Sequence, residues 1–164
     1  FKNKRIMKTN RTLSGLLITI MLISCGKFNV NEGTYTSVDV FKFINSPHYD
    51  PVRIEGDLVT ASFKIDDLPD GSRKATLTTT YNDIYGGTVT DHGILDGKGN
   101  FIVTKMDLFS QKIGTDTCHY KMDGKFLIVS DPKGILEASS LFAQIPPVIG
   151  DSRYHARYFF RKEK

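Results

Sequence analysis

Apolar and polar residues alternate along most of the chain after residue 32. In one stretch the apolar residues Val59, Phe63 and Ile65 alternate with polar neighbours. A period of two places successive side chains on opposite faces of a β-strand. The pattern therefore predicts a chain of short strands. We expect them at 33–44, 52–66 (broken near Gly56 and Asp57), 73–81, 87–95, 100–108, 113–122, 125–130 and 153–161.

The turns between these stretches are short and rich in Gly, Pro and Asp. Asp96–Asn100 and Asp123-Gly124 each stand between two strand patterns, which is the favoured setting for a tight hairpin. Sequential strands joined by short turns hide their edges when the sheet closes on itself. The predicted fold is therefore all-β: a small antiparallel up-and-down β-barrel of about eight strands, with a β-sandwich as the alternative.

The alternation also assigns side chains to the inside of the barrel. The opposite face carries Thr, Lys and Arg, which do not fit the continuous lipid-facing surface of an outer-membrane barrel. A shift of the register by one residue would exchange the two faces, so the pattern fixes the register. The side chains expected inside are Val59, Phe63, Ile65, Leu77, Tyr120, Tyr158 and Phe160.

One long and fairly apolar segment, 132–151, breaks the alternation. Long connections are often functional, so it could be a flap over the mouth of the barrel. Apolar residues in a connection more often simply pack, and this favours an end cap of the core. If the barrel instead holds a ligand, the side chains expected to contact it are Phe63, Leu77, Tyr120, Leu141, Phe142, Ile145 and Tyr158.

Three short pieces of the body resemble the lipocalin-like bacterial lipoproteins. They are the opening Gly33-Thr34-Tyr35, the hairpin at 122–128 and the closing Phe159-Phe160-Arg161. Tyr35 stands where that family commonly has Trp. The resemblance implies a lipocalin-like barrel at 33–164, a single domain that takes up a small apolar or amphipathic molecule.

The first residues have the order of an export signal. Lys8 and Arg11 precede the apolar run 13–24, which is too short to span a membrane, since spanning takes about 20 residues. Residues 1–24 are therefore predicted to be a signal peptide. Met7 starts a signal of ordinary length, so we expect 1–6 to be an upstream extension.

The end of this run, Leu22-Ile23-Ser24-Cys25, resembles the lipobox of bacterial lipoproteins. The resemblance implies cleavage before Cys25, lipidation of its thiol with fatty acyl chains such as palmitate, and a tether over 25–32. Gly26 follows where an Asp favours the inner membrane in some families, so the outer membrane is expected, with the body facing the periplasm or the cell surface. An ordinary secretory signal with an incidental Cys is the alternative.

The net charge of +4 is unevenly distributed. Residues 1–24 hold five basic residues and no acid, which leaves 17 basic and 18 acidic residues in the rest, a net charge of −1. This balance does not predict a nucleic-acid surface, which would be strongly basic.

Candidate chemistry in the body is sparse. His48, His92, His119 and His155 do not have metal-ligand spacing, and we expect His119 and His155 at the surface. Asp91 and His92 are neighbours on a strand and point to opposite faces, so they cannot pair as in a catalytic triad. Cys118 is expected to be a small buried residue. We therefore expect no enzyme, no metal and no cofactor.

Two functions fit these features best. The first is a non-catalytic, membrane-tethered module that binds a small apolar or amphipathic ligand or serves as an accessory. The second is a protein-interaction lipoprotein, such as an envelope sensor, an inhibitor or an assembly factor, with a filled barrel. An internal cavity of about 300 Å³ or more favours the first, and a packed interior favours the second. A hydrolase using His119 or Asp91 ranks last.

Overall fold

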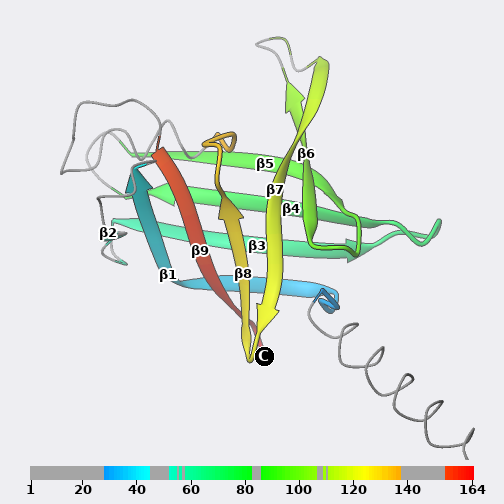
Figure 1. Cartoon of the computed structure of the whole chain (residues 1–164), viewed down its shortest axis with the longest axis horizontal. Helices are drawn as coiled ribbons and strands as arrows, with labels where there is room; N and C mark the ends of the chain where they lie inside the picture. The colour runs from blue at the N-terminus through cyan, green and yellow to red at the C-terminus, as the bar shows by residue number, and fades with distance from the viewer. Residues whose placement is uncertain are drawn as a thin grey trace, which may run out of the picture.

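The computed structural model describes residues 28–44, 52–54, 56, 58–82, 86–106, 109, 111–137 and 154–164. Nine strands in this part of the chain form one antiparallel sheet, which closes because β1 also pairs with β9 (Figure 1). No helix with the length and hydropathy of a membrane span occurs in the described ranges. The strands are β1 (Gly33–Ile44), β2 (Val52–Ile54), β3 (Val59–Asp67), β4 (Arg73–Tyr81), β5 (Gly87–Leu95), β6 (Asn100–Met106), β7 (Lys112–Asp123), β8 (Phe126–Asp131) and β9 (Tyr154–Lys162).

Eight strands form the barrel wall, and β2 is an additional short strand. The first residues of β1 pair with β3, and its residues 40–42 pair with β2, so β2 continues the line of β3 after a break. This confirms the broken strand expected at 52–66. The order of neighbours confirms the up-and-down barrel over the β-sandwich.

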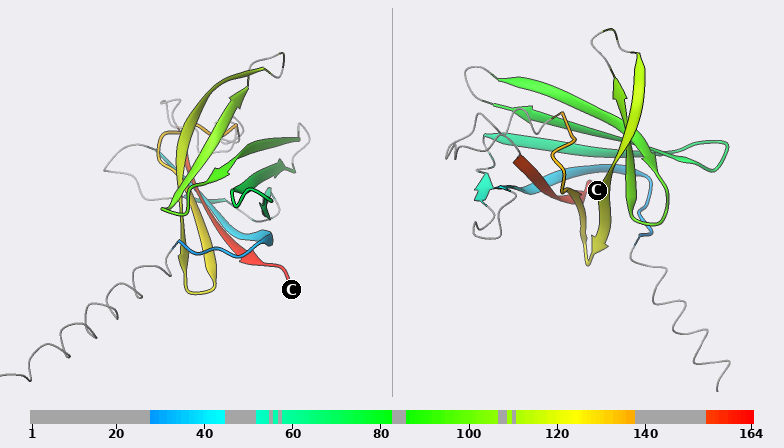
Figure 2. Two further views of the ribbon diagram at one scale, coloured as in Figure 1. Left: turned by 90° about the vertical axis from the view of Figure 1, so that its right-hand side faces the viewer. Right: turned by 45° about the horizontal axis from the view of Figure 1, so that its top comes forward.

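The strands surround the interior in two differently oriented groups. Figure 1 shows β3, β4 and β5 running across the view, behind β7, β8 and β9, which run up and down. The β6–β7 hairpin extends past the neighbouring strands. Its strand β6 pairs with β5 only at Phe101–Val103, and β7 pairs with β8 only from His119 onward. Its outer half therefore projects beyond the barrel (Figure 2).

The interior is an apolar core. All the side chains predicted to face inward are buried, none more than 3% exposed, which confirms the predicted register. Phe63 lies at the centre, with ring centroids 5.2 Å from Phe101 and 5.7 Å from Phe160. Tyr158 stacks on Phe160 at 5.7 Å. The outward neighbours Lys64 and Arg161 are exposed.

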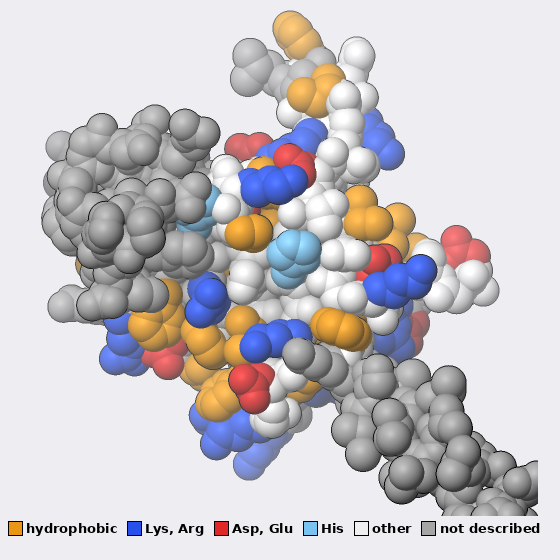
Figure 3. All heavy atoms as spheres, in the orientation of Figure 1, with side chains coloured by type: hydrophobic (Ala, Val, Ile, Leu, Met, Phe, Trp, Pro, Cys, Tyr) orange, Lys and Arg blue, Asp and Glu red, His pale blue; other side chains and the backbone are white. Residues whose placement is uncertain are grey.

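Charges of both signs lie among polar and apolar side chains on the outside of the barrel. On the face shown in Figure 3, Lys and Arg side chains are interspersed with Asp and Glu. The ion pairs of the described residues are exposed or half-exposed, for example Lys64–Asp66 at 2.8 Å and Arg73–Asp67 at 2.9 Å. Exposed pairs of this kind add little to stability, so the core provides most of it.

Candidate functional site

Four of the residues predicted to contact a ligand belong to the packed core. Phe63, Leu77 and Tyr158 are 0% exposed and Tyr120 is 3% exposed. A side chain that lines a cavity with room for solvent keeps accessible surface, so Phe63, Leu77 and Tyr158 pack against other side chains instead. Tyr120 is also buried, except where it lines a pocket on the outside of the wall. Contact between them and a ligand stays a prediction. The other three, Leu141, Phe142 and Ile145, lie outside the described residues.

The residues just before β1 close one end of the barrel. Val30 is 1% exposed and belongs to the core. The Tyr35 hydroxyl donates to the carbonyl of Asn31 at 2.9 Å, and the Arg73 guanidinium donates to the carbonyl of Val30. Residues 28–32, which the sequence assigned to a polar tether, are therefore part of the folded body. The physical reason is the apolar Val30, which is stabilised by burial in the core.

Two buried carboxylates, which we call the carboxylate latch (Asp91 and Asp131), close the opposite end. Asp131 accepts hydrogen bonds from the backbone N–H groups of Ile135 and Leu136, both at 2.9 Å. Asp91 accepts one from the N–H of Glu137, with its oxygens 3.1 and 3.2 Å away. Leu136 is thereby held in the core at 2% exposure. Within the segment 132–151, the described part 132–137 is thus an end cap.

Burial raises the pKa of Asp91 to about 6, well above its ordinary 3.8. The N–H of Glu137 and the charge of Lys105 act in the opposite direction, because both stabilise the carboxylate. Lys105 also donates to the carbonyl of Ile135, so the same ammonium group supports the cap and the latch.

We expect the Asp91→Asn substitution to change how stability depends on pH. Between pH 4 and 6 the folded wild type holds a proton that the unfolded chain has released, so its free energy of unfolding falls as the pH rises. The loss reaches about 3 kcal/mol above pH 6. The folded-state pKa of about 6 lies roughly two pH units above the ordinary 3.8, and one pH unit corresponds to about 1.4 kcal/mol. The variant lacks this loss. Urea unfolding of both proteins at pH 4 to 8 measures it, and parallel pH profiles would contradict the expectation.

Cys118 and His155 are both buried, although burial was expected only for Cys118. Cys118 is fully buried as predicted, and burial raises the pKa of its thiol, so it is not a thiolate at neutral pH. His155, expected at the surface, is only 3% exposed. Alternation gives the face on which a residue lies, not whether further chain covers that face. In the described ranges, no three His, Cys, Asp or Glu side chains are grouped to hold a metal ion.

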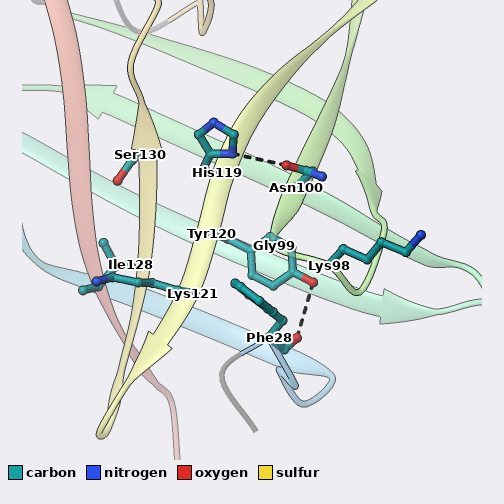
Figure 4. A pocket seen from close by; sticks show the side chains of 9 residues that line it. All are labelled: Phe28, Lys98, Gly99, Asn100, His119, Tyr120, Lys121, Ile128 and Ser130. Atoms are coloured by element: carbon teal, nitrogen blue, oxygen red, sulfur yellow. Dashed lines mark hydrogen bonds between the residues drawn. The ribbon is translucent and has the colours of Figure 1, made fainter. Parts of the chain in front are cut away.

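A pocket of about 250 Å³, which we call the outer pocket, lies on the outside of the wall (Figure 4). The side chains of His119 and Lys121 on β7 alternate with the buried Cys118 and Tyr120 and therefore point outward. Across the hairpin, His119 pairs with Ser130 and Lys121 with Ile128. The lining residues are Phe28, Lys98, Gly99, Asn100, His119, Tyr120, Lys121, Ile128 and Ser130.

The turn between β5 and β6 shapes one side of the outer pocket. The Asp96 carboxylate accepts from the N–H groups of Lys98 at 2.7 Å and Asn100 at 2.9 Å, and from the Asn100 side chain at 2.6 Å. Gly99 has φ of +99°, and a Cβ there would lie 2.5 Å from the ring of Phe28. Only glycine combines this conformation with such a close approach.

Phe28 forms another side of the outer pocket. The Phe28 ring packs edge-on against the Tyr120 ring, with centroids 6.4 Å apart. The Tyr120 hydroxyl donates to the backbone carbonyl of Phe28 at 3.4 Å. Burial raises the pKa of Tyr120, so the donor keeps its proton. The sequence does not predict this pocket, because Phe28 lies in the expected tether and outward residues on a strand are ordinarily solvated. The signal that was present is the Gly97-Lys98-Gly99 turn.

The outer pocket combines apolar, polar and cationic groups. Lys98, His119 and Lys121 are exposed, and none of its nine lining residues is acidic. His119 Nδ1 is hydrogen-bonded to Asn100 Oδ1 at 3.2 Å, which orients both side chains (Figure 4). This arrangement can hold a small molecule that joins an anionic group to an apolar part.

Comparisons of the chain with models of protein families, with curated proteins and with solved structures give no match. The protein class that the structure defines is a closed, antiparallel, eight-stranded β-barrel with one additional strand.

Proposed function

We propose that this protein is a lipid-anchored, non-catalytic lipoprotein of the bacterial cell envelope that acts through the outside of its barrel. The anchor is Cys25, which follows a basic segment and an apolar run, and Gly26 favours the outer membrane. The observation that carries the mode of action is the packed interior. A filled barrel favours contacts at the outer surface over an internal ligand, because it leaves no cavity of about 300 Å³ for a small molecule.

The outer pocket is the part of that surface best suited to a small amphipathic ligand. Its volume of about 250 Å³ is close to the lower limit of pockets that hold small molecules, about 300 Å³. It lies beside Phe28, three residues after Cys25, so ligand binding would take place next to the anchor.

A protein partner is the second candidate, and the projecting β6–β7 hairpin favours it. Met106, Phe109 and Ile113 are 48%, 83% and 69% exposed. Exposed apolar side chains gathered in one place commonly mark interaction surfaces. With this hairpin as its contact surface, the protein would act on its partner as an envelope sensor, an inhibitor or an assembly factor.

The non-catalytic assignment is supported by the roles of the buried polar groups. Asp91 and Asp131 accept backbone hydrogen bonds from the end cap, and the Cys118 thiol is protonated. The two carboxylates therefore have a structural role, and the thiol is not an activated nucleophile.

The anchor is tested with the Cys25→Ala variant. We expect wild-type protein to enter the detergent phase on partitioning and to yield an N-terminal peptide with acylated Cys25 in mass spectrometry. The variant should stay unprocessed or remain in the aqueous phase, because no thiol is available for lipidation. Cys118→Ala, at the buried cysteine, is the matched control and should behave as wild type. A Cys25→Ala protein that matures and partitions normally would refute the anchor.

A further inference from the structure

We propose that the outer pocket binds the anionic phosphate head group of a phospholipid in the leaflet that anchors the protein. The proposal rests on the lipid anchor proposed above and specifies the ligand of the same outer surface. It follows from the charge of the pocket, its size and its distance along the chain from Cys25.

The charge of the outer pocket is complementary to a phosphate. Lys98 and Lys121 are exposed at its rim, on either side of Phe28 in Figure 4, and none of the nine lining residues is acidic. Ammonium groups bind phosphate as strong point charges. Asn100 and Ser130 add neutral hydrogen-bonding groups beside the His119 ring.

The size of the outer pocket suits a head group better than a whole lipid. Its volume is about 250 Å³, and its apolar residues, Phe28 and Ile128, lie beside the polar ones. Amphipathic surfaces of this kind lie at the boundary between head groups and acyl chains. The acyl chains of the bound lipid would thus stay in the bilayer while the phosphate enters the pocket.

The chain length places this pocket at the membrane surface. Phe28 lies three positions after Cys25, and a fully extended chain covers at most about 11 Å over that length. The head-group layer of one leaflet is about 5–8 Å thick. A lipidated Cys25 therefore keeps Phe28 within or just above this layer.

Tethering makes modest affinity sufficient. An anchored pocket faces head groups at a high effective concentration, so even millimolar binding would fill it. The protein would then lie on the leaflet with β7 and β8 toward it, because these strands supply His119, Lys121, Ile128 and Ser130.

The test is a binding titration of the protein purified from membranes in a nonionic detergent. The probes are dihexanoyl phosphatidylglycerol, dihexanoyl phosphatidylcholine and inorganic phosphate, and Kd is measured from NMR shifts of the His119 ring and the Lys98 amide. The pocket variant is Lys98→Gln with Lys121→Gln. The matched control removes the same charge at Lys74 and Lys112, which are exposed and do not line the pocket.

We expect phosphatidylglycerol to bind at least about tenfold more tightly than phosphatidylcholine, since each nearby lysine adds to the attraction of an anionic lipid. The pocket variant should lose this preference, and the control should stay within about twofold of wild type. Equal binding of the two lipids, or equal losses in both variants, would overturn the proposal. Inorganic phosphate binding as tightly as phosphatidylglycerol would make free phosphate the ligand and overturn the lipid source.

The same preparations separate this proposal from the anchor. Mass spectrometry of the N-terminal peptide reports the lipid on Cys25. Acylated Cys25 without a preference for phosphatidylglycerol refutes the head-group site and leaves the anchor standing. A preference without acylation supports the site and refutes the anchor.

Discussion

Phe63→Ala and Phe160→Ala should each lower the free energy of unfolding by about 3–5 kcal/mol, the usual cost of truncating a buried phenylalanine. Both side chains are 0% exposed, and their rings are in contact, with centroids 5.7 Å apart. Each truncation removes apolar contacts and leaves a cavity in the filled barrel. Urea unfolding followed by circular dichroism measures the loss.

The matched controls are the outward neighbours on the same strands. Lys64→Ala and Arg161→Ala should cost about 0.5 kcal/mol or less, as surface changes usually do. Lys64 forms an exposed ion pair with Asp66, and the Arg161 guanidinium lies 5.5 Å from the ring centre of Phe126, near the surface. Equal, small losses in all four variants would mean that the inward face is wrongly assigned.

Tyr158→Ala extends this experiment to the state of the interior. If the barrel is filled, the variant should lose stability as Phe160→Ala does, because its ring stacks on Phe160. A small loss together with changed uptake of an apolar fluorescent probe would indicate an open cavity lined by Tyr158. That outcome would favour the internal ligand over the outer surface.

The barrel could be predicted from the sequence because its signals are local. The alternation and the turns between the stretches indicate where each strand begins and ends. Gly56 and Asp57 also indicate the break between Ile54 and Val59. Closure then followed from the need to hide strand edges. The inward residues were predictable because a β-strand has a strict period of two.

The outer pocket and the carboxylate latch could not be predicted in the same way, because both depend on contacts between distant segments. Phe28 meets Tyr120, and Asp91 meets Glu137, across long stretches of chain. Asp91 also occupies an inward position, where the pattern favours an apolar residue. The carboxylate accepts from the backbone N–H of Glu137, which belongs to a segment without a periodic pattern.

Asp131→Ala should have the second large effect, a loss of about 3 kcal/mol in the free energy of unfolding. Asp131 is 0% exposed and accepts from the N–H groups of Ile135 and Leu136, both at 2.9 Å. Each buried donor left without its acceptor costs about 1–3 kcal/mol. Because the lost bonds hold the cap 132–137, the cap should open locally before the barrel unfolds.

Hydrogen exchange at the amides of Ile135 and Leu136 distinguishes this local opening from a general loss of stability. In Asp131→Ala their protection should fall by about a hundredfold, which corresponds to about 3 kcal/mol, while protection in the β3–β4 pair falls less. Asp131→Asn keeps one acceptor oxygen and should lose roughly half as much. The control is Asp66→Ala, whose carboxylate is half-exposed and pairs with the Lys64 ammonium at 2.8 Å, outside the cap. Unchanged protection of both amides would show that the cap is held by the burial of Leu136 and not by the latch.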